Sequence, residues 1–278
     1  MQRPCSAALG AMHRRQVRRE PWPEFDAFDP APYAPELLRE ARDNWAERAR
    51  AEHGSVHQFS QLSLAFAVAR APLELQGAVA RLITDEVRHA ELCAGMAAAC
   101  APGESLEWPT PRAPWQDPPL AGPTPELLAW AARAVLVACC LGETISRPLL
   151  EGVVVVATDP LPEAIARQIL RDEQLHATFG WEALAWLLPR LEPDARARLE
   201  QHDLPRALAG FEATTACGFR AADLAGTTLR LRRGPPNLGV LSPREQAQIF
   251  FAALEGEVFA KLRGLGFDPL AAWRARGA

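Results

Sequence analysis

The sequence has little of several features that define common functional classes. Only one lysine, Lys261, and one tyrosine, Tyr33, occur in 278 residues, and the formal net charge is −4. It therefore lacks the basic excess typical of nucleic-acid-binding domains and of electrostatically held membrane proteins. Because Tyr33 precedes the first long helical pattern, a subunit that generates a tyrosyl radical is also disfavoured.

Long apolar runs and paired cysteines are missing as well. The longest strictly apolar run, Ala134 to Leu141, is far shorter than the ~20 residues of a membrane span. Residues 13–20 are basic but no apolar region follows them, so a secretory signal is not predicted. The six cysteines form no C-x-x-C pair, which disfavours zinc-ribbon and rubredoxin sites. We therefore expect a cytoplasmic protein that binds neither membrane nor nucleic acid.

Helical patterns fill most of the chain, and no convincing strand alternation occurs. Prolines mark the breaks near 71 and 160, while Thr124-Pro125 and Ser242-x-x-Glu245 are typical of helix starts. The fold class is therefore predicted to be all-α. Helices are expected at about 35–70, 72–100, 125–157, 160–188, 194–218 and 243–265.

The breaks divide the chain into three predicted regions. Residues 1–34 are polar and aperiodic, which predicts a loose N-terminal arm. Residues 35–190 contain two antiparallel helix hairpins joined by a proline-rich connection of about 24 residues, an unusual length for a compact domain. A four-helix bundle with a long crossover between its second and third helices has such a connection. Residues 191–278 are expected to add helices that pack on this bundle.

One short motif occurs twice, once in each predicted hairpin. Both copies read Asp-Glu-x-x-His-Ala, and the glutamate and histidine are three residues apart. On a helix this spacing directs both side chains off one face, so they can reach a single metal ion. The copies are Asp85-Glu86-x-x-His89 and Asp172-Glu173-x-x-His176.

A further glutamate precedes each copy at a similar distance. Glu52 lies 34 residues before Glu86, and Glu143 lies 30 residues before Glu173. The helix break falls roughly midway in each case, so folding brings each glutamate level with its motif. All four glutamates lie on apolar helix stripes, where four unpaired buried carboxylates would be too costly without cations. The sequence predicts a two-metal centre with the ligands Glu52, Glu86, His89, Glu143, Glu173 and His176.

This ligand set resembles that of the ferritin-like superfamily of di-iron and di-manganese carboxylate proteins, over about residues 35–190. Asp85-Glu86-Val87-Arg88-His89 is further similar to the D-E-x-R-H motif of its oxygen-activating branch, which includes bacterial multicomponent monooxygenases and acyl desaturases. The resemblance implies a ferritin-like four-helix bundle in which Asp85 and Asp172 orient the histidines and Arg88 pairs with an aspartate. It also implies that Glu86 and Glu173 bridge the metals while Glu52 and Glu143 are terminal ligands.

The second copy departs from the motif, because Leu175 stands where the first copy has arginine. The resemblance therefore assigns no arginine partner to the aspartates from the second copy. His53 and His57 flank Glu52 at positions that point away from its helix face, so they are not expected to be ligands. His202 lacks a partner in the sequence.

The resemblance implies a non-haem di-iron enzyme, an oxygenase or oxidase acting on a small, partly apolar substrate. Two iron ions would be the cofactor, with manganese–iron or manganese as alternatives, and dioxygen the co-substrate. An external electron donor and a monomer or homodimer are expected. The alternative is a ferroxidase or metal-storage protein without an organic substrate, and a third hypothesis is a helical protein with a structural metal or none. The helical extension after residue 188 favours the enzyme, because extra helices can shape a substrate pocket.

Overall fold

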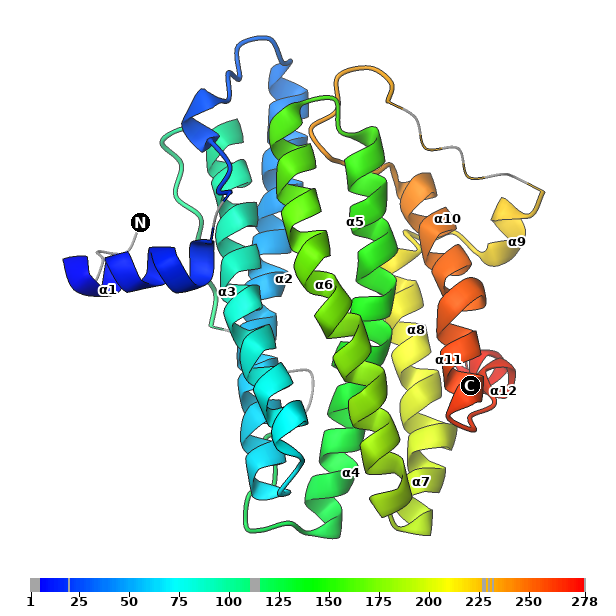
Figure 1. The fold of residues 1–278 in the computed structure, drawn as a ribbon. Coiled ribbons are helices and arrows are strands. Elements are labelled where there is room, and N and C mark those ends of the chain that lie inside the picture. The colour runs from blue at the N-terminus through cyan, green and yellow to red at the C-terminus, as the bar shows by residue number, and fades with distance from the viewer. Residues whose placement is uncertain are drawn as a thin grey trace.

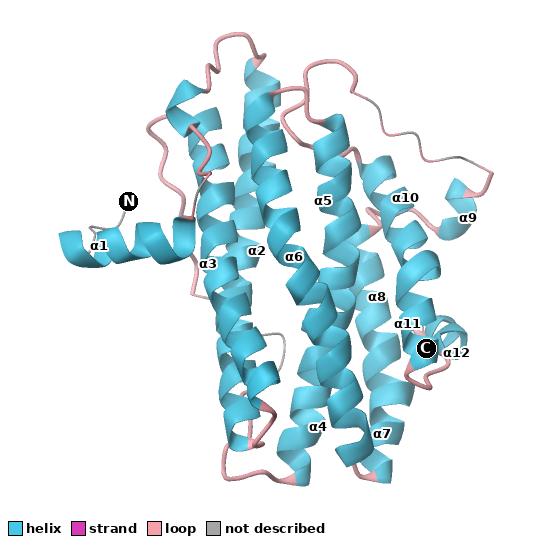
Figure 2. Ribbon diagram, in the orientation of Figure 1, coloured by secondary structure: helices cyan, strands magenta, loops and turns pink. Residues whose placement is uncertain are grey.

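The computed structural model describes residues 6–19, 21–110, 116–226, 229, 231 and 233–277. Every regular element in these ranges is helical, and they contain no strand. The all-α prediction is therefore confirmed, and Figure 2 shows helices connected only by loops.

The first hairpin consists of α2 (Pro35–Val68) and α3 (Leu73–Cys100), which pack against each other along their lengths. Arg70 adopts a positive φ of 55° between them, a conformation that ends the helix and turns the chain. Pro72 follows as the residue that caps α3, because proline cannot continue a helix but suits its start.

The second hairpin joins a long, uninterrupted helical stretch to α6 (Pro160–Leu187). The hydroxyl of Thr124 accepts a hydrogen bond from the amide of Leu127, as the predicted helix start requires. Helix α6 packs against both this stretch and α3, so four long helical segments lie side by side (Figure 1). The long stretch contains α4 (Pro125–Ala134), the π-helix η3 (Val135–Glu143) and α5 (Thr144–Val156).

The long connection between the hairpins runs beside α2. In Figure 1, α3 rises to the same end of the molecule as α5, so the chain returns along the helices before α4 begins. Gln61 on α2 donates a hydrogen bond to Asp117 at 2.6 Å, and Trp130 donates one to the carbonyl of Gln116 at 2.7 Å. These contacts place Gln116 and Asp117 against α4 and α2.

The helices after Leu187 form a further layer against α5 and η3 (Figure 1). Its core side chains, such as Phe250 and Leu254, belong to the same buried cluster as Leu141. The predicted capping box forms, because Ser242 and Glu245 bond each other's backbone amides. The elements are η4 (Leu188–Arg190), α7 (Pro193–Arg198), η5 (Leu199–Asp203), α8 (Leu204–Thr215), α9 (Ala221–Leu224), α10 (Pro243–Ala253), η6 (Leu254–Val258), α11 (Phe259–Gly264) and α12 (Pro269–Ala275).

The N-terminal region differs from the expected loose arm. Its described residues include α1 (Ala7–His13), the π-helical turn η1 (Arg14–Arg18) and the 3-10 turn η2 (Phe25–Ala27). The Phe25 ring lies so close to α3 that a Cβ atom at Gly95 would be 2.5 Å from it. These anchoring residues are single and irregularly spaced, so hydrophobic periodicity could not predict them.

The helical stretch Pro125–Val156 is long and apolar enough, by length and composition alone, to cross a membrane. However, 61% of its most apolar window is buried inside the protein, as in the core helix of a globular domain. The stretch also contains Glu143, which faces the interior between the hairpins. We therefore interpret it as a core helix.

Candidate metal centre

The structure brings all six predicted ligands together between the two hairpins. Each comes from one of four helical segments: α2, α3, the end of η3, and α6. Five are almost fully buried, and only the glutamate on α2 is partly exposed. They are Glu52, Glu86, His89, Glu143, Glu173 and His176.

Glu86 is at the centre of this cluster. Its carboxylate, with ligand atoms of Glu52 and His89, forms a group in which all atoms lie within 4.8 Å of one another. The same carboxylate forms a second such group with Glu143 and His176. Glu86 therefore belongs to both groups, and its two oxygens face different histidines.

Glu173 faces Glu86 from the opposite helix and also reaches both histidines. One of its oxygens lies 3.6 Å from Nδ1 of His89, and the other lies 3.9 Å from Nδ1 of His176. Glu86 approaches the same two atoms at 3.9 and 3.1 Å. The Nδ1 atoms of both histidines therefore point into a space that is lined by carboxylates.

The other ring nitrogen of each histidine faces an aspartate from the opposite motif. Nε2 of His89 lies 3.2 Å from Asp172, which is within hydrogen-bonding distance. Nε2 of His176 lies 3.8 Å from Asp85, which is near but beyond a hydrogen bond. An aspartate behind the histidine fixes the tautomer and ring orientation in many metal sites. The resemblance implied this role for both aspartates, and the structure adds that the pairing crosses between helices.

Orphaned polar atoms show that the cluster suits metal ions. Oε2 of Glu86, Oε2 of Glu173 and Nδ1 of both His89 and His176 are buried and have no hydrogen-bond partner among the described residues. Buried polar atoms in native proteins nearly always have partners, so such a group needs an explanation. Carboxylate oxygens and imidazole nitrogens are ligands suited to iron and manganese. The cluster could therefore hold metal, whose positive charge would offset that of the carboxylates.

The pKa values reflect the crowding of charge. Burial raises the pKa of Glu86 well above its usual 4.5, and the charges of Glu52 and Glu143 add to the effect. Burial and the charge of Glu143 likewise raise the pKa of Glu173. Burial by itself lowers the pKa of His176, but the surrounding carboxylates outweigh it and raise that pKa well above 6.5. The raised pKa values favour protons on atoms that metal ions would otherwise bind.

A π-helix positions Glu143 in the cluster. The element η3 ends at this glutamate, and π-helical turns are frequent at functional sites. Helix α6 approaches η3 closely at Gly180, where an added Cβ would lie 2.8 Å from the backbone carbon of Cys139. Glycine is thus required for this contact, one turn after His176.

Three residues missed by the sequence analysis complete the surroundings of the aspartates. Arg81 donates hydrogen bonds to Asp85 at 2.8 and 2.9 Å, and the i, i+4 spacing could have predicted this pair. Gln168 accepts a hydrogen bond from Arg88 at 2.5 Å. Arg19, from the N-terminal region, donates to both aspartates, and no local pattern indicated it. The residues around the aspartates that the sequence analysis did not predict are therefore Arg19, Arg81 and Gln168.

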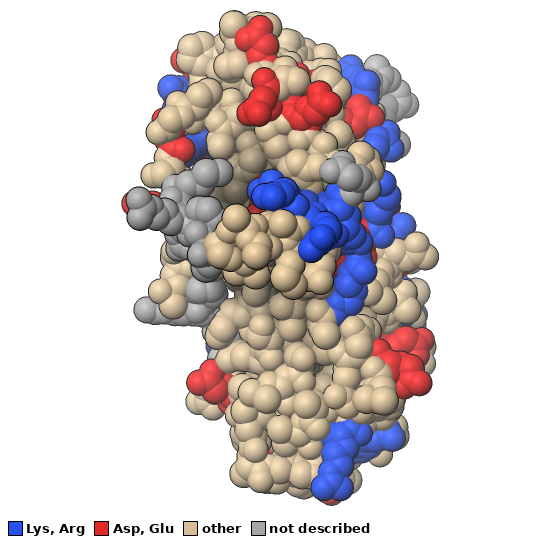
Figure 3. Space-filling view, turned by 60° about the vertical axis from the view of Figure 1, so that its left-hand side comes forward, with Lys and Arg blue, Asp and Glu red and all other residues tan. Residues whose placement is uncertain are grey.

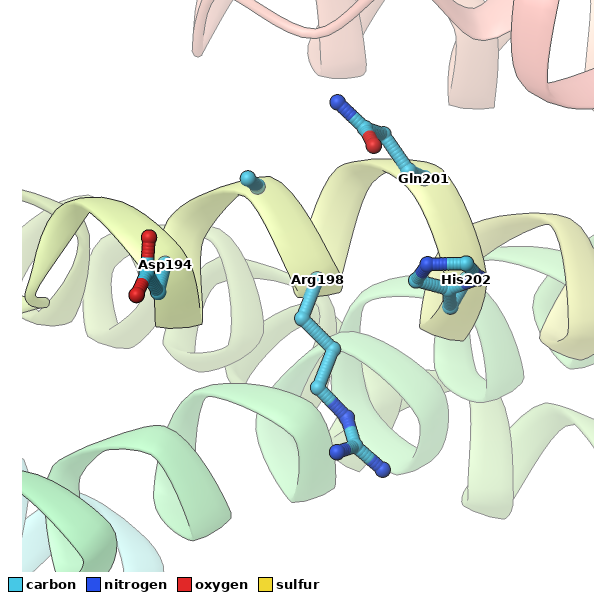
Figure 4. Close-up of a pocket in the computed structure, with 5 residues that line it drawn as sticks. Asp194, Arg198, Gln201 and His202 are labelled. Atoms are coloured by element: carbon cyan, nitrogen blue, oxygen red, sulfur yellow. The ribbon is translucent and has the colours of Figure 1, made fainter.

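The remaining candidate histidines lie outside the cluster. The His53 ring packs against Trp108 of the long connection, with ring centroids 5.0 Å apart. His202 lines an open surface pocket of about 540 Å³ on α7 and η5, together with Asp194 and Arg198 (Figure 4). That pocket contains none of the six predicted ligands and is separate from the candidate metal centre.

Comparison of the chain with protein-family models, with curated proteins and with solved structures gives no match. The buried acidic and histidine groups that could hold metal ions are therefore the basis for any functional conclusion.

Proposed function

We propose that the chain is a ferritin-like di-iron protein that activates dioxygen to oxidise a small, partly apolar substrate. One observation carries the proposal: four glutamates and two histidines from four helical segments meet in the interior, with both histidine Nδ1 atoms facing carboxylates. This is the ligand arrangement of di-metal carboxylate bundles. The long connection between α3 and α4 supports the same fold.

In this proposal each ligand has a defined position. Glu86 and Glu173, which lie near both histidines, would hold the two ions together with Glu52, Glu143, His89 and His176. When bound, two ferrous ions would supply the electrons that reduce dioxygen. The protein would supply a dry, carboxylate-lined interior, and Asp85 and Asp172 would orient the imidazoles.

Two further features support the choice of an oxygenase or oxidase over a radical-generating subunit. The Asp172–Arg88 contact of 2.9 Å is the aspartate–arginine pair expected from the D-E-x-R-H resemblance. The single tyrosine, Tyr33, donates its hydroxyl to Asp159 at the start of α6, at 2.6 Å. Burial and this carboxylate raise the pKa of Tyr33 to about 12, so it is engaged elsewhere than at the metal centre.

Iron titration tests the proposal against metal storage. Anaerobic protein would be loaded with Fe²⁺ in steps, exposed to air, and followed by oxygen consumption, elemental analysis and size-exclusion chromatography. We expect about two iron ions per chain, saturation of oxygen uptake near two equivalents until a reductant is added, and elution as a monomer or homodimer. Hundreds of irons in a large particle would favour the ferroxidase alternative, whereas no bound metal would refute the centre.

A further inference from the structure

The two copies of the motif are surrounded unequally. In the first copy, Arg81 and Arg88 stand near the aspartates, one four residues before Asp85 and one three residues after it. The corresponding positions of the second copy are Gln168 and Leu175, which carry no charge. At these two compared positions, α3 therefore has arginine twice and α6 has none.

This inequality leaves Asp85 without an arginine partner from the opposite helix, where only His176 faces it. Arg88 reaches across from α3 and donates to Asp172 at 2.9 Å. The equivalent contact to Asp85 would need a donor at position 175. Leu175 is instead 37% exposed and lines a shallow surface pocket with Leu75 on α3.

Arg19, in the N-terminal region, supplies the arginine contact with Asp85 that position 175 does not provide. Its Nη2 atom donates to Asp85 at 2.7 Å and lies 3.3 Å from an oxygen of Asp172, so one guanidinium bridges both aspartates. Asp85 and Asp172 are 1% and 8% exposed. Arg19 holds this position with a φ of 44°, an unusual value for a residue other than glycine that persists only where surrounding contacts fix it.

The segment that carries Arg19 is fixed to α3 by separate contacts. Arg18 donates to Glu91 at 3.2 Å, and His13 lies 2.9 Å from the other oxygen of the same carboxylate. Figure 3 shows basic side chains gathered on the side of the molecule from which α1 projects. Anchoring of the segment and contact with the aspartates therefore use different side chains, and mutation can separate them.

We propose that Arg19 is a positioning residue of the metal centre, which replaces the arginine missing at Leu175 and holds Asp85 and Asp172 behind the two histidines. The inference rests on the metal-binding part of the proposed function. Charged hydrogen bonds to a carboxylate restrict its position, and the carboxylate in turn restricts the imidazole that faces it. Loss of Arg19 should therefore loosen both histidines, although Arg19 contacts no predicted ligand in the described structure.

Cobalt binding tests this proposal without any catalytic assay. Purified full-length wild type, Arg19→Gln and Arg18→Gln would be titrated with Co²⁺, with the visible absorption bands recording both affinity and ligand geometry. We expect Arg19→Gln to weaken Co²⁺ binding about 10-fold, at the low end for residues that support ligands, and to alter the bands. Arg18→Gln should match wild type in both, since it removes contacts with Glu91 and with the Trp22 ring but none with the two aspartates. Thermal unfolding in EDTA would verify that each variant is folded.

A rescue variant tests the equivalence of the two positions. Adding Leu175→Arg to Arg19→Gln should restore Co²⁺ affinity and the wild-type bands, because an arginine on α6 could then reach Asp85 as Arg88 reaches Asp172. Equal affinities of Arg19→Gln and Arg18→Gln would overturn the positioning role, and failure of the rescue would overturn the equivalence. Absence of Co²⁺ binding by wild type would instead refute the metal centre of the proposed function.

Discussion

Replacement of Asp172 by asparagine should lower both the free energy of unfolding and the metal affinity of the proposed centre. Asp172 accepts hydrogen bonds from Arg88 and Arg19 and faces Nε2 of His89. Burial by itself raises the pKa of Asp172, but His89 and the two arginines lower it from 3.8 to about 2. Because a tenfold change in acidity corresponds to about 1.4 kcal/mol, the folded state favours the carboxylate by roughly 2 kcal/mol.

The asparagine variant retains the shape of the side chain but leaves the buried Arg88 without its charged partner. We expect the free energy of unfolding to fall by about 2–4 kcal/mol, since breaking a buried ion pair costs about 3–5 kcal/mol and Asp172 is near the edge of the interior. Metal affinity should fall about 10–100-fold, because His89 loses its acceptor. The stability difference is present above pH 3.8 and disappears as the pH falls through about 2, where the wild-type carboxylate is protonated.

Urea denaturation in EDTA and metal titration would measure the two effects. Glu163→Gln on the same helix is a matched control, because Glu163 pairs with Arg167 at 2.9 Å on the surface, where ion pairs contribute about 0–1 kcal/mol. If Asp172→Asn and Glu163→Gln proved equal in stability and in metal affinity, Asp172 would be an ordinary surface acid and our reasoning about the cluster would be wrong.

Three other predictions follow from the site. His176→Ala should lose part of the bound metal in elemental analysis, whereas His202→Ala, in a surface pocket, should retain all of it. In EDTA the melting temperature should fall as the pH rises. The pKa values of Glu86 and His176 are higher in the folded state than in the unfolded state, so Glu86 contributes to this fall from pH 4.5 upward and His176 above pH 6.5. Metal-induced stabilisation should grow over the same range, and a flat melting profile would contradict these shifts. Gly180→Ala should cost about 1–3 kcal/mol and reduce metal occupancy, because its methyl group would lie 2.8 Å from η3, whereas Gly210→Ala, which meets nothing within 4 Å, should be tolerated in urea denaturation.

Most of the helical architecture was predictable because its signals are local. Thr124 and the Ser242–Glu245 pair sit where helices start, and the proline breaks separate the long helices as expected. The six candidate ligands came from spacing along helices, and the structure places them in one cluster, Glu173 through its contacts with both histidines. Their role as metal ligands remains a prediction that metal analysis must test.

The features that sequence reasoning missed depend on contacts between distant parts of the chain or on a local change from α-helical to π-helical hydrogen bonding. The π-helix η3, which ends at Glu143, has i→i+5 hydrogen bonds in place of the i→i+4 bonds of an α-helix. An apolar run such as Ala134 to Leu141 does not reveal this change. Arg19 lies 66 residues before Asp85, in a segment without hydrophobic period, so only its folded position reveals the contact. The attachment of the N-terminal region through Phe25 was hidden for the same reason.

The crossed aspartate–histidine pairs have a consequence for cooperativity. Each hairpin contains a glutamate, an E-x-x-H pair and an aspartate, yet the aspartate faces the histidine of the other hairpin. Neither hairpin alone therefore holds a supported histidine. In the proposed centre, an ion bound to His89 would restrict the imidazole and through it Asp172, which is on α6 together with His176. The second ion would then enter a site already ordered by the first, so occupancy should rise from zero to two ions with little of the singly loaded protein.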